Sequence, residues 1–292
     1  SRRMNESDPA LSREGGASLW MRTVGSVSAF RKNVIASYAG KIWNLVMALG
    51  VVPWQIHFLG RESYGVVGVY TSLLSLLLML DMGLSAATNR EISRLSVSGD
   101  NAARISDVGR TIGILYWGLG LIICAGVMLA APVVANKWLQ TQSLAPAVVA
   151  HAVELMGIVL ATQWIVNFYV GALSGLQKLV LMNGINILFA TLRGLGGVLT
   201  IWLISPTIEA FFLSQIAAAF GQMAVFTWAY RKTMPLGNRR PRFDTGVIRH
   251  LAGFSGGVWT IYLLGIPLGF ADKVILSKLI PLDVFGYYTL AC

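Results

Sequence analysis

The stretch LLMLDMGLSAATNREISRL, residues 77–95, decides the fold class. It begins as membrane-core sequence, with Asp81 inside the apolar part, and it ends as a charged helix edge that carries Arg90 and Arg94. A membrane-spanning helix needs about 20 mostly apolar residues. The apolar run that leads into this stretch begins near residue 65, so we interpret residues 65–88 as a spanning helix that emerges into water at a basic end.

The composition of the whole chain agrees with a membrane protein. Of its 292 residues, 55% are hydrophobic and only 12% are charged, and the mean hydropathy of +0.65 exceeds that of soluble domains. The net charge of +10 is not a nucleic-acid signature, because the Lys and Arg residues lie in the gaps between apolar runs. Cys124 and Cys292 have no metal-ligand spacing and form no disulfide framework. We therefore expect no nucleic-acid partner, no cofactor and no metal site.

Seven apolar windows have the length of a spanning helix, and an eighth begins near Val284. They cover residues 34–58, 65–88, 110–134, 147–173, 180–204, 208–230 and 251–277. None alternates in polarity as the strands of a membrane barrel do. The sequence predicts an all-α, polytopic membrane protein.

The basic residues between the windows predict the orientation of the chain. One side carries seventeen of them: Arg2, Arg3, Arg13, Arg22, Arg31, Lys32, Arg90, Arg94, Arg104, Arg110, Lys178, Arg231, Lys232, Arg239, Arg240, Arg242 and Arg249. The other side carries Arg61, Lys137 and Lys278. Because Lys and Arg accumulate in cytoplasmic loops, we expect the amino terminus in the cytoplasm.

The chain divides into four predicted parts. Residues 1–32 read as a cytosolic tail, 33–230 as a first six-helix transmembrane bundle, 231–250 as a cytosolic linker, and 251–292 as the start of a second bundle. Residues 90–110, REISRLSVSGDNAARISDVGR, read as another long cytosolic link.

An internal repeat supports this division. LGRESYGVVGVY, residues 59–70, aligns with IPLDVFGYYTLA, residues 280–291, so that Tyr64 meets Phe285 and Gly65 meets Gly286. If the repeat is real, the seventh helix is a second copy of the first, and the two units are related by an axis along the membrane normal. The sequence then ends about two helices into its second half.

The segments FLGRESYGVVGVYTSLL, residues 58–74, and LDMGLSAATNREISR, residues 80–94, followed by an Arg-rich loop, carry a family resemblance. They resemble the amino-terminal half of polysaccharide exporters of the O-antigen flippase type, in the multidrug/oligosaccharidyl-lipid/polysaccharide superfamily. The resemblance implies two six-helix bundles around a central cavity. It also implies export of undecaprenyl-diphosphate-linked glycans, for O-antigen or exopolysaccharide synthesis, across the bacterial inner membrane and alongside polysaccharide polymerase machinery. Against this pattern, we expect the chain to be truncated, because most of the second bundle is missing.

Lys41 and Asp81 are the first candidates for function inside the membrane, where an ionisable group costs about 2.5–3.5 kcal/mol. Both lie about 12 Å below the cytoplasmic surface at about 1.5 Å per residue. We expect Asp81 to pair with Lys41 or to border a water-filled cytoplasmic mouth. The alternative is that Lys41 reaches the headgroups by itself and Asp81 bonds a nearby Ser or Asn.

His151, Glu154 and Asp272 are candidates for ion coupling or gating near the opposite surface. His151 and Glu154 share one helix face, either as an interfacial hydrogen bond or as a proton-titrating pair. Asp272 is expected to meet that face if the two halves close against each other there.

Arg193 is the strongest candidate for substrate binding, with Lys41 at the entrance. It lies near the membrane midplane, and its planar guanidinium suits the oxygens of a lipid pyrophosphate. The glycines of TLRGLGGVLT, residues 191–200, permit close backbone approach. The alternative is a structural Arg bonded to helix carbonyls.

Other functions fit the sequence less well. It shows no nucleophile–base pattern, nucleotide loop or metal cluster, so we expect no enzyme. An ion-coupled drug or cation antiporter of the same superfamily is the main alternative, and a lipid II flippase is another. A membrane scaffold without transport activity would have no use for a charge at the midplane.

Overall fold

The computed structural model describes residues 37–47, 49–97, 102–139, 144–235, 241–249, 265 and 271–291. Within these ranges the regular structure is helical and contains no strand. Six helices in them are long and apolar enough to cross a membrane. The expected all-α, polytopic membrane fold is thereby confirmed.

The helices follow one another with short connections. They are a first helix Ser37–Leu59, α2 Arg61–Val97, α3 Ala102–Val133, the π-helix η1 Val134–Trp138, α4 Pro146–Gly175, α5 Leu179–Leu203, α6 Ile208–Thr233 and α8 Leu282–Ala291. Two further helical segments cover residues 245–249 and 271–279. The residues of the amino-terminal tail, 1–32, lie outside the described ranges, as do most of the window at 251–277 and part of the linker at 231–250.

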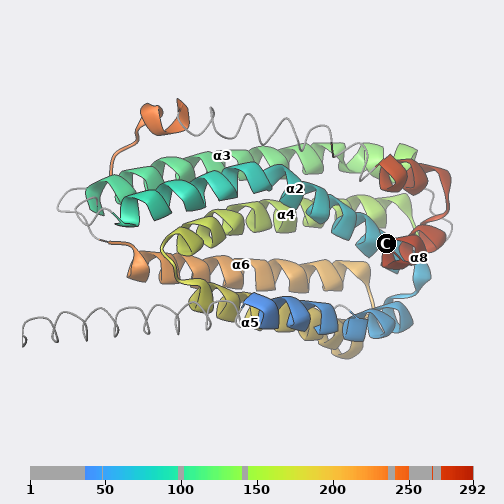
Figure 1. The fold of residues 1–292 in the computed structure, drawn as a ribbon. Helices are drawn as coiled ribbons and strands as arrows, with labels where there is room; N and C mark the ends of the chain where they lie inside the picture. Colours follow the sequence, from blue (N-terminus) through green and yellow to red (C-terminus); the bar gives the residue numbers. More distant parts are fainter. Residues whose placement is uncertain are drawn as a thin grey trace, which may run out of the picture.

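Helix α4 forms the centre of the molecule. Apolar residues lie all around it, and 67% of its spanning window is buried, against 17–39% in the other candidate spans. A helix with apolar residues all around it is expected in the interior, and the polar residues of α4 include His151 and Glu154 near its start. Figure 1 shows α2 and α3 on one side of α4 and α6 on the other, with α5 beyond α6, and the contacts between elements agree.

Local chemistry sets several helix ends. Gly60, with φ of +81°, separates the first helix from α2 in a backbone conformation that suits glycine. Thr207 caps α6, because its hydroxyl accepts from the backbone N–H of Ala210. Pro132 lies inside the last turn of α3, where the missing N–H favours the change to the π-helix η1.

The hydropathy windows located the spanning helices but misjudged two helix ends. The expected link at 90–110 is mostly helical, because α2 continues to Val97 and α3 already begins at Ala102. A hydropathy window ends where the apolar residues end. A helix that contains charged and small residues can continue beyond that point into water. These extensions carry Arg90, Arg94 and Arg104.

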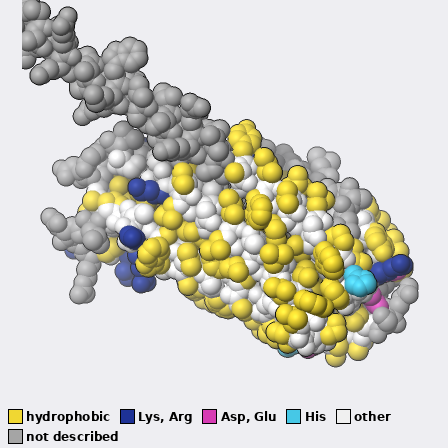
Figure 2. Space-filling model, turned by 90° about the horizontal axis from the view of Figure 1, so that it is seen from below, with side chains coloured by type: hydrophobic (Ala, Val, Ile, Leu, Met, Phe, Trp, Pro, Cys, Tyr) yellow, Lys and Arg dark blue, Asp and Glu magenta, His cyan; other side chains and the backbone are white. Residues whose placement is uncertain are grey.

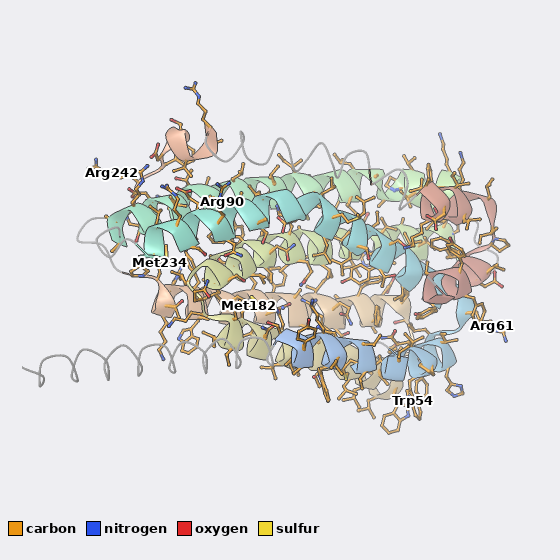
Figure 3. The ribbon with its side chains drawn as sticks, in the orientation of Figure 1. Trp54, Arg61, Arg90, Met182, Met234 and Arg242 are labelled. Atoms are coloured by element: carbon orange, nitrogen blue, oxygen red, sulfur yellow. The ribbon has the colours of Figure 1, made fainter. Side chains whose placement is uncertain are left out.

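The surface separates apolar sides from basic ends. Figure 2 shows hydrophobic side chains over most of one face, with Lys and Arg near its two ends. We define the arginine-rich end as the one where α2 ends, α3 begins and α6 ends. Figure 3 places Arg90 and Arg242 there, and it places Trp54 and Arg61 at the opposite end.

Candidate functional site

Arg193 lies near the middle of α5 and belongs to a polar cluster inside the bundle. One of its terminal nitrogens donates to the side-chain oxygen of Gln222 on α6. The same oxygen lies 3.4 Å from the amide nitrogen of Gln163 on α4. Gln222 in turn donates to Asn186, about two turns before Arg193 on α5, over 3.2 Å. Three helices therefore contribute amide side chains around one guanidinium.

Two further groups complete this cluster. The amide of Gln215 donates to the backbone carbonyl of Arg193 over 3.1 Å. Tyr70 of α2 is buried and lies near the guanidinium. Its ring packs edge-to-face on Phe212, with 5.6 Å between the ring centres. The hydrogen bonds to Arg193 itself therefore come from α6, and Gln163 of α4 bonds the Gln222 oxygen that accepts from the guanidinium.

The charge on Arg193 is not neutralised by a neighbouring carboxylate. The ion pairs found among the described residues are Arg94–Glu91, at 2.6 Å, and His151–Glu154, at 3.4 Å. The Nε atom of Arg193 is buried and has no hydrogen-bond partner there. Because a guanidinium stays protonated, the bundle holds a positive charge with one donor left unsatisfied.

The glycines beside Arg193 allow neighbouring helices to approach closely, as the sequence predicted. A methyl group at Gly194 would lie 2.8 Å from the Met47 side chain of the first helix. A methyl group at Gly197 would lie 3.1 Å from both the Gln215 amide nitrogen and the Phe211 ring. The Arg193 turn of α5 therefore lies against the first helix and α6.

Asp81 belongs to a second polar cluster, nearer the arginine-rich end. It is 3% exposed, and its Oδ1 accepts from the hydroxyl of Tyr116 on α3 over 2.5 Å. Asn167 of α4 lies near this carboxylate, and Ser85 lies near the Tyr116 hydroxyl. The carboxylate is thus bonded to a neutral hydroxyl from α3.

The expected pair between Asp81 and Lys41 is wrong. Lys41 is exposed, and its ammonium lies 5.9 Å from the centre of the Tyr38 ring on its own helix. This part of the first helix packs on α5, where Trp43 donates to Thr191 over 2.7 Å. Equal depth did not make Lys41 and Asp81 neighbours, because Asp81 faces α3 and α4. The bond that Asp81 makes is to the Tyr116 hydroxyl, and the alternative bond to a nearby Ser or Asn stays a prediction.

The candidates near the opposite end do not meet. His151 and Glu154 lie 3.4 Å apart on one partly exposed face of α4, as their spacing predicted. Asp272 instead accepts a hydrogen bond from Tyr288 of α8. The expected contact of Asp272 with the His151 face is therefore not formed.

A cavity of about 280 Å³ lies between α2, η1, α8 and the helix at 271–279. Apart from Lys273 and two serines, its walls are apolar and include Val69, Trp138 and Phe285. Neither Arg193 nor Lys41 lines it. Such walls suit a hydrocarbon chain better than a charged headgroup.

In the described part of the chain, no group of three or more His, Cys, Asp or Glu residues is arranged to hold a metal ion.

Comparison with known proteins gives the family to which the chain belongs and a solved structure with the same fold. A family model described as polysaccharide biosynthesis protein matches residues 30–292. The chain belongs to this family. A solved structure of a transporter of the multidrug/oligosaccharidyl-lipid/polysaccharide superfamily, from Pyrococcus furiosus Vc1, has the same fold with a TM-score of 0.65 at 16% sequence identity. The alignment covers 85% of this chain and 55% of that one, so the chain spans about half the length of that transporter. No protein of curated function matches the sequence.

In this chain, sequence reasoning found Arg193 and Asp81 but missed their partners. Gln163, Asn167, Asn186, Gln215 and Gln222 all lie within windows predicted to span the membrane. Amide side chains at that depth need hydrogen-bond partners, since no water is available in the hydrocarbon. Their presence in the windows was the signal that could have located both clusters.

Proposed function

We propose that this protein is a flippase that moves an undecaprenyl-diphosphate-linked oligosaccharide across the bacterial inner membrane, with its amino terminus in the cytoplasm. The fold and the family support a membrane transporter of polysaccharide biosynthesis. A pyrophosphate headgroup needs positive charge along its path, because an isolated anion is costly in hydrocarbon.

One observation carries the proposal: the guanidinium of Arg193 lies within the bundle without a carboxylate partner and with Nε unbonded. Its bonded partner, the amide of Gln222, leaves the net charge intact. A phosphate oxygen can satisfy the remaining donors by charge-assisted hydrogen bonds. Lys41, exposed on the first helix, is proposed as a second contact nearer the entrance.

The proposal is tested with Arg193→Ala, Arg193→Lys and Arg231→Ala in the intact protein. Arg231 is exposed in the last turn of α6, so its loss controls for a change in total charge. In reconstituted vesicles, flipping of a labelled undecaprenyl-diphosphate glycan should fall at least tenfold in Arg193→Ala. Arg193→Lys should keep part of the rate, because the charge remains while the planar fork is lost, and Arg231→Ala should flip normally.

Two results would remove Arg193 from the mechanism. One is full flipping by a folded Arg193→Ala protein. The other is an equal loss in Arg231→Ala, which would mean that total charge matters rather than the buried guanidinium. Thermal unfolding of each variant in detergent separates lost binding from lost structure.

The second candidate function is an ion-coupled drug or cation antiporter, and the buried Asp81 favours it. A carboxylate bonded only to neutral groups is a suitable site for a proton or a small cation. His151, Glu154 and Asp272 remain proposals for coupling or gating, although all three are at least partly exposed. Drug susceptibility of a deletion strain distinguishes this function from glycan export, since a glycan flippase should leave it unchanged.

A further inference from the structure

The apolar cavity at the end opposite the arginine-rich end lies between helices from two parts of the chain. Helices α2 and η1 contribute one set of its walls, and α8 and the helix at 271–279 contribute the other. Trp138 of η1 donates to Ser277 over 3.0 Å, and both residues line the cavity. Arg193 and Lys41 do not line it. The cavity is therefore separate from the Arg193 cluster.

The cavity opens sideways onto the apolar surface of the molecule. Trp138 and Val274 line it, and yet they are 38% and 45% exposed. Ile275 and Leu279, on the same helix as Val274, are exposed as well. The exposed apolar side of a spanning protein faces lipid tails, which are as apolar as its own side chains. A hydrocarbon chain can thus enter the cavity from the bilayer without crossing water.

One wall of the cavity lies at the depth of hydrocarbon. On α2 the lining residues extend from Val69 to Leu76, about 10 Å along the helix at about 1.5 Å per residue. Val69 is eight residues from the start of α2 at Arg61, or about 12 Å along the helix. The headgroup layer on each side of a bilayer is roughly 5–7 Å thick. The wall from Val69 to Leu76 therefore lies below the headgroups.

Two lysines lie at the shallow end of the cavity. Lys273 lines it, and the ammonium of Lys278 lies 5.3 Å from the centre of the Trp138 ring in its wall. Lys278 is next to the end of the helix at 271–279, and Lys273 is about 9 Å from that end at about 1.5 Å per residue. Both lysines therefore lie near the layer where lipid phosphates are found, and ammonium groups bind phosphate oxygens.

The acidic neighbour of Lys273 is directed elsewhere. Asp272 does not line the cavity, and it accepts a hydrogen bond from Tyr288 of α8. Consecutive helix residues do not face the same way, whereas Lys273 and Ser277, four apart, share one face and both line the cavity. Among the described residues that line it there is no carboxylate. The cavity thus combines apolar walls with a positive charge.

We propose that this cavity binds one acyl chain of an anionic phospholipid from the surrounding bilayer, with Lys273 and Lys278 beside its phosphate. A phospholipid has its phosphate at the depth of the lysines and its acyl chains at the depth of Val69 and Leu76. The cavity opens to the bilayer and not to the Arg193 cluster, so its ligand is one of the lipids of the bilayer itself. The inference does not depend on which molecule the protein transports.

The first experiment measures the preference for an anionic headgroup. Native mass spectrometry of the intact protein compares phosphatidylglycerol with phosphatidylcholine of the same chain length. Phosphatidylglycerol should be retained about fivefold more or better, because lysines near an anionic lipid each add to its binding. The double variant Lys273→Ala and Lys278→Ala should lose this preference. Lys137→Ala is the matched control, since Lys137 is exposed on η1 at the same end but does not line the cavity.

The second experiment locates the acyl chain. Phosphatidylglycerol with a diazirine in its acyl chain should cross-link to residues 69–76 and 273–277. Ser72→Phe places a ring in the cavity and should abolish the cross-links to 273–277. Ser75→Phe is the control, because Ser75 is exposed on the same helix and does not line the cavity. Thermal unfolding in detergent shows whether each variant is folded, and should Ser72→Phe fail to fold, the lysine variants decide alone.

Three results would overturn the proposal. One is equal retention of the two phospholipids by the unchanged protein, and another is undiminished cross-linking to 273–277 in a folded Ser72→Phe protein. The third concerns the source of the chain. Excess unlabelled phosphatidylglycerol should displace the probe, whereas displacement by the same amount of undecaprenyl phosphate instead would assign the cavity to the carrier lipid.

Discussion

At the scale of single residues, Gln222 is what holds the Arg193 guanidinium in place. Its side chain is 5% exposed and contacts Arg193, Gln163 and Asn186. Gln222→Leu removes the acceptor of a buried charged donor, so we expect it to lower the free energy of unfolding by about 1–3 kcal/mol. Thermal and denaturant unfolding in detergent measure this loss.

The control for Gln222 is Gln163→Leu in the same cluster. Gln163 makes the longer contact, at 3.4 Å, and its partner is the neutral Gln222 rather than a charged group, so its replacement should cost clearly less. Equal losses in the two variants would mean that Arg193 does not depend on the Gln222 oxygen.

The bond between Tyr116 and Asp81 leads to a second prediction at this scale. Tyr116→Phe removes a donor from a buried carboxylate and should cost about 1–3 kcal/mol. In an Asp81→Asn background the same change should cost less, because a neutral amide tolerates the loss of a donor better. A double-mutant cycle measures the coupling, and additive effects would contradict the bond as the structure places it.

At the scale of elements, the segment after α6 is fastened to α3 through two backbone N–H groups. Arg242 donates to the Asp107 carboxylate over 2.6 Å, and Asp244 donates to the Thr111 hydroxyl over 3.0 Å. The Thr111 hydroxyl itself donates to the carbonyl of Asp107, which leaves a lone pair free to accept from Asp244. Val247 is buried in the same hydrophobic cluster as residues of α3. Much of the predicted linker is therefore attached to the first group of helices.

Loss of these two acceptors should loosen the segment without unfolding α3. In the double variant Asp107→Ala and Thr111→Val, we expect amide hydrogen exchange over residues 242–249 to speed up about tenfold or more, as for the loss of about 1–2 kcal/mol of local stability. Arg110→Ala, exposed on the adjacent position of α3, should leave the exchange unchanged. Unchanged exchange in the double variant would show that Val247 alone holds the segment.

The spanning helices could be predicted from the sequence because a run of about 20 apolar residues matches the thickness of a bilayer and is rare in soluble helices. The neighbours of each helix could not be predicted from the sequence. Hydropathy gives the depth of a residue in the membrane, but it does not give the direction in which its side chain points. Lys41 and Asp81 show this limit: they were placed at one depth, and yet Lys41 lies on a helix packed against α5 while Asp81 faces Tyr116 of α3. Gly65 and Gly286, which the internal repeat aligns, lie in contact in the structure, because a methyl group on Gly286 would lie 3.2 Å from the Cα of Gly65; the alignment predicted symmetry and not this contact.

At the scale of the whole molecule, the asymmetry of charge predicts which end faces the cytoplasm. The exposed residues Arg231 and Arg242 lie toward the arginine-rich end, and Arg61 and Lys137 lie toward the opposite end. Lys and Arg are retained in the cytoplasm during insertion. We therefore predict that the arginine-rich end is cytoplasmic and that the end with Trp54 and Arg61 faces the outer surface.

Single cysteines test this orientation in intact cells, after Cys124 and Cys292 are replaced by Ser. A membrane-impermeant maleimide added outside should label Arg61→Cys and Lys137→Cys, whereas Arg231→Cys and Arg242→Cys should react only after the membrane is permeabilised. All four positions are exposed, so burial does not protect them, and a denatured sample shows that every thiol is reactive. The reverse pattern would invert the topology.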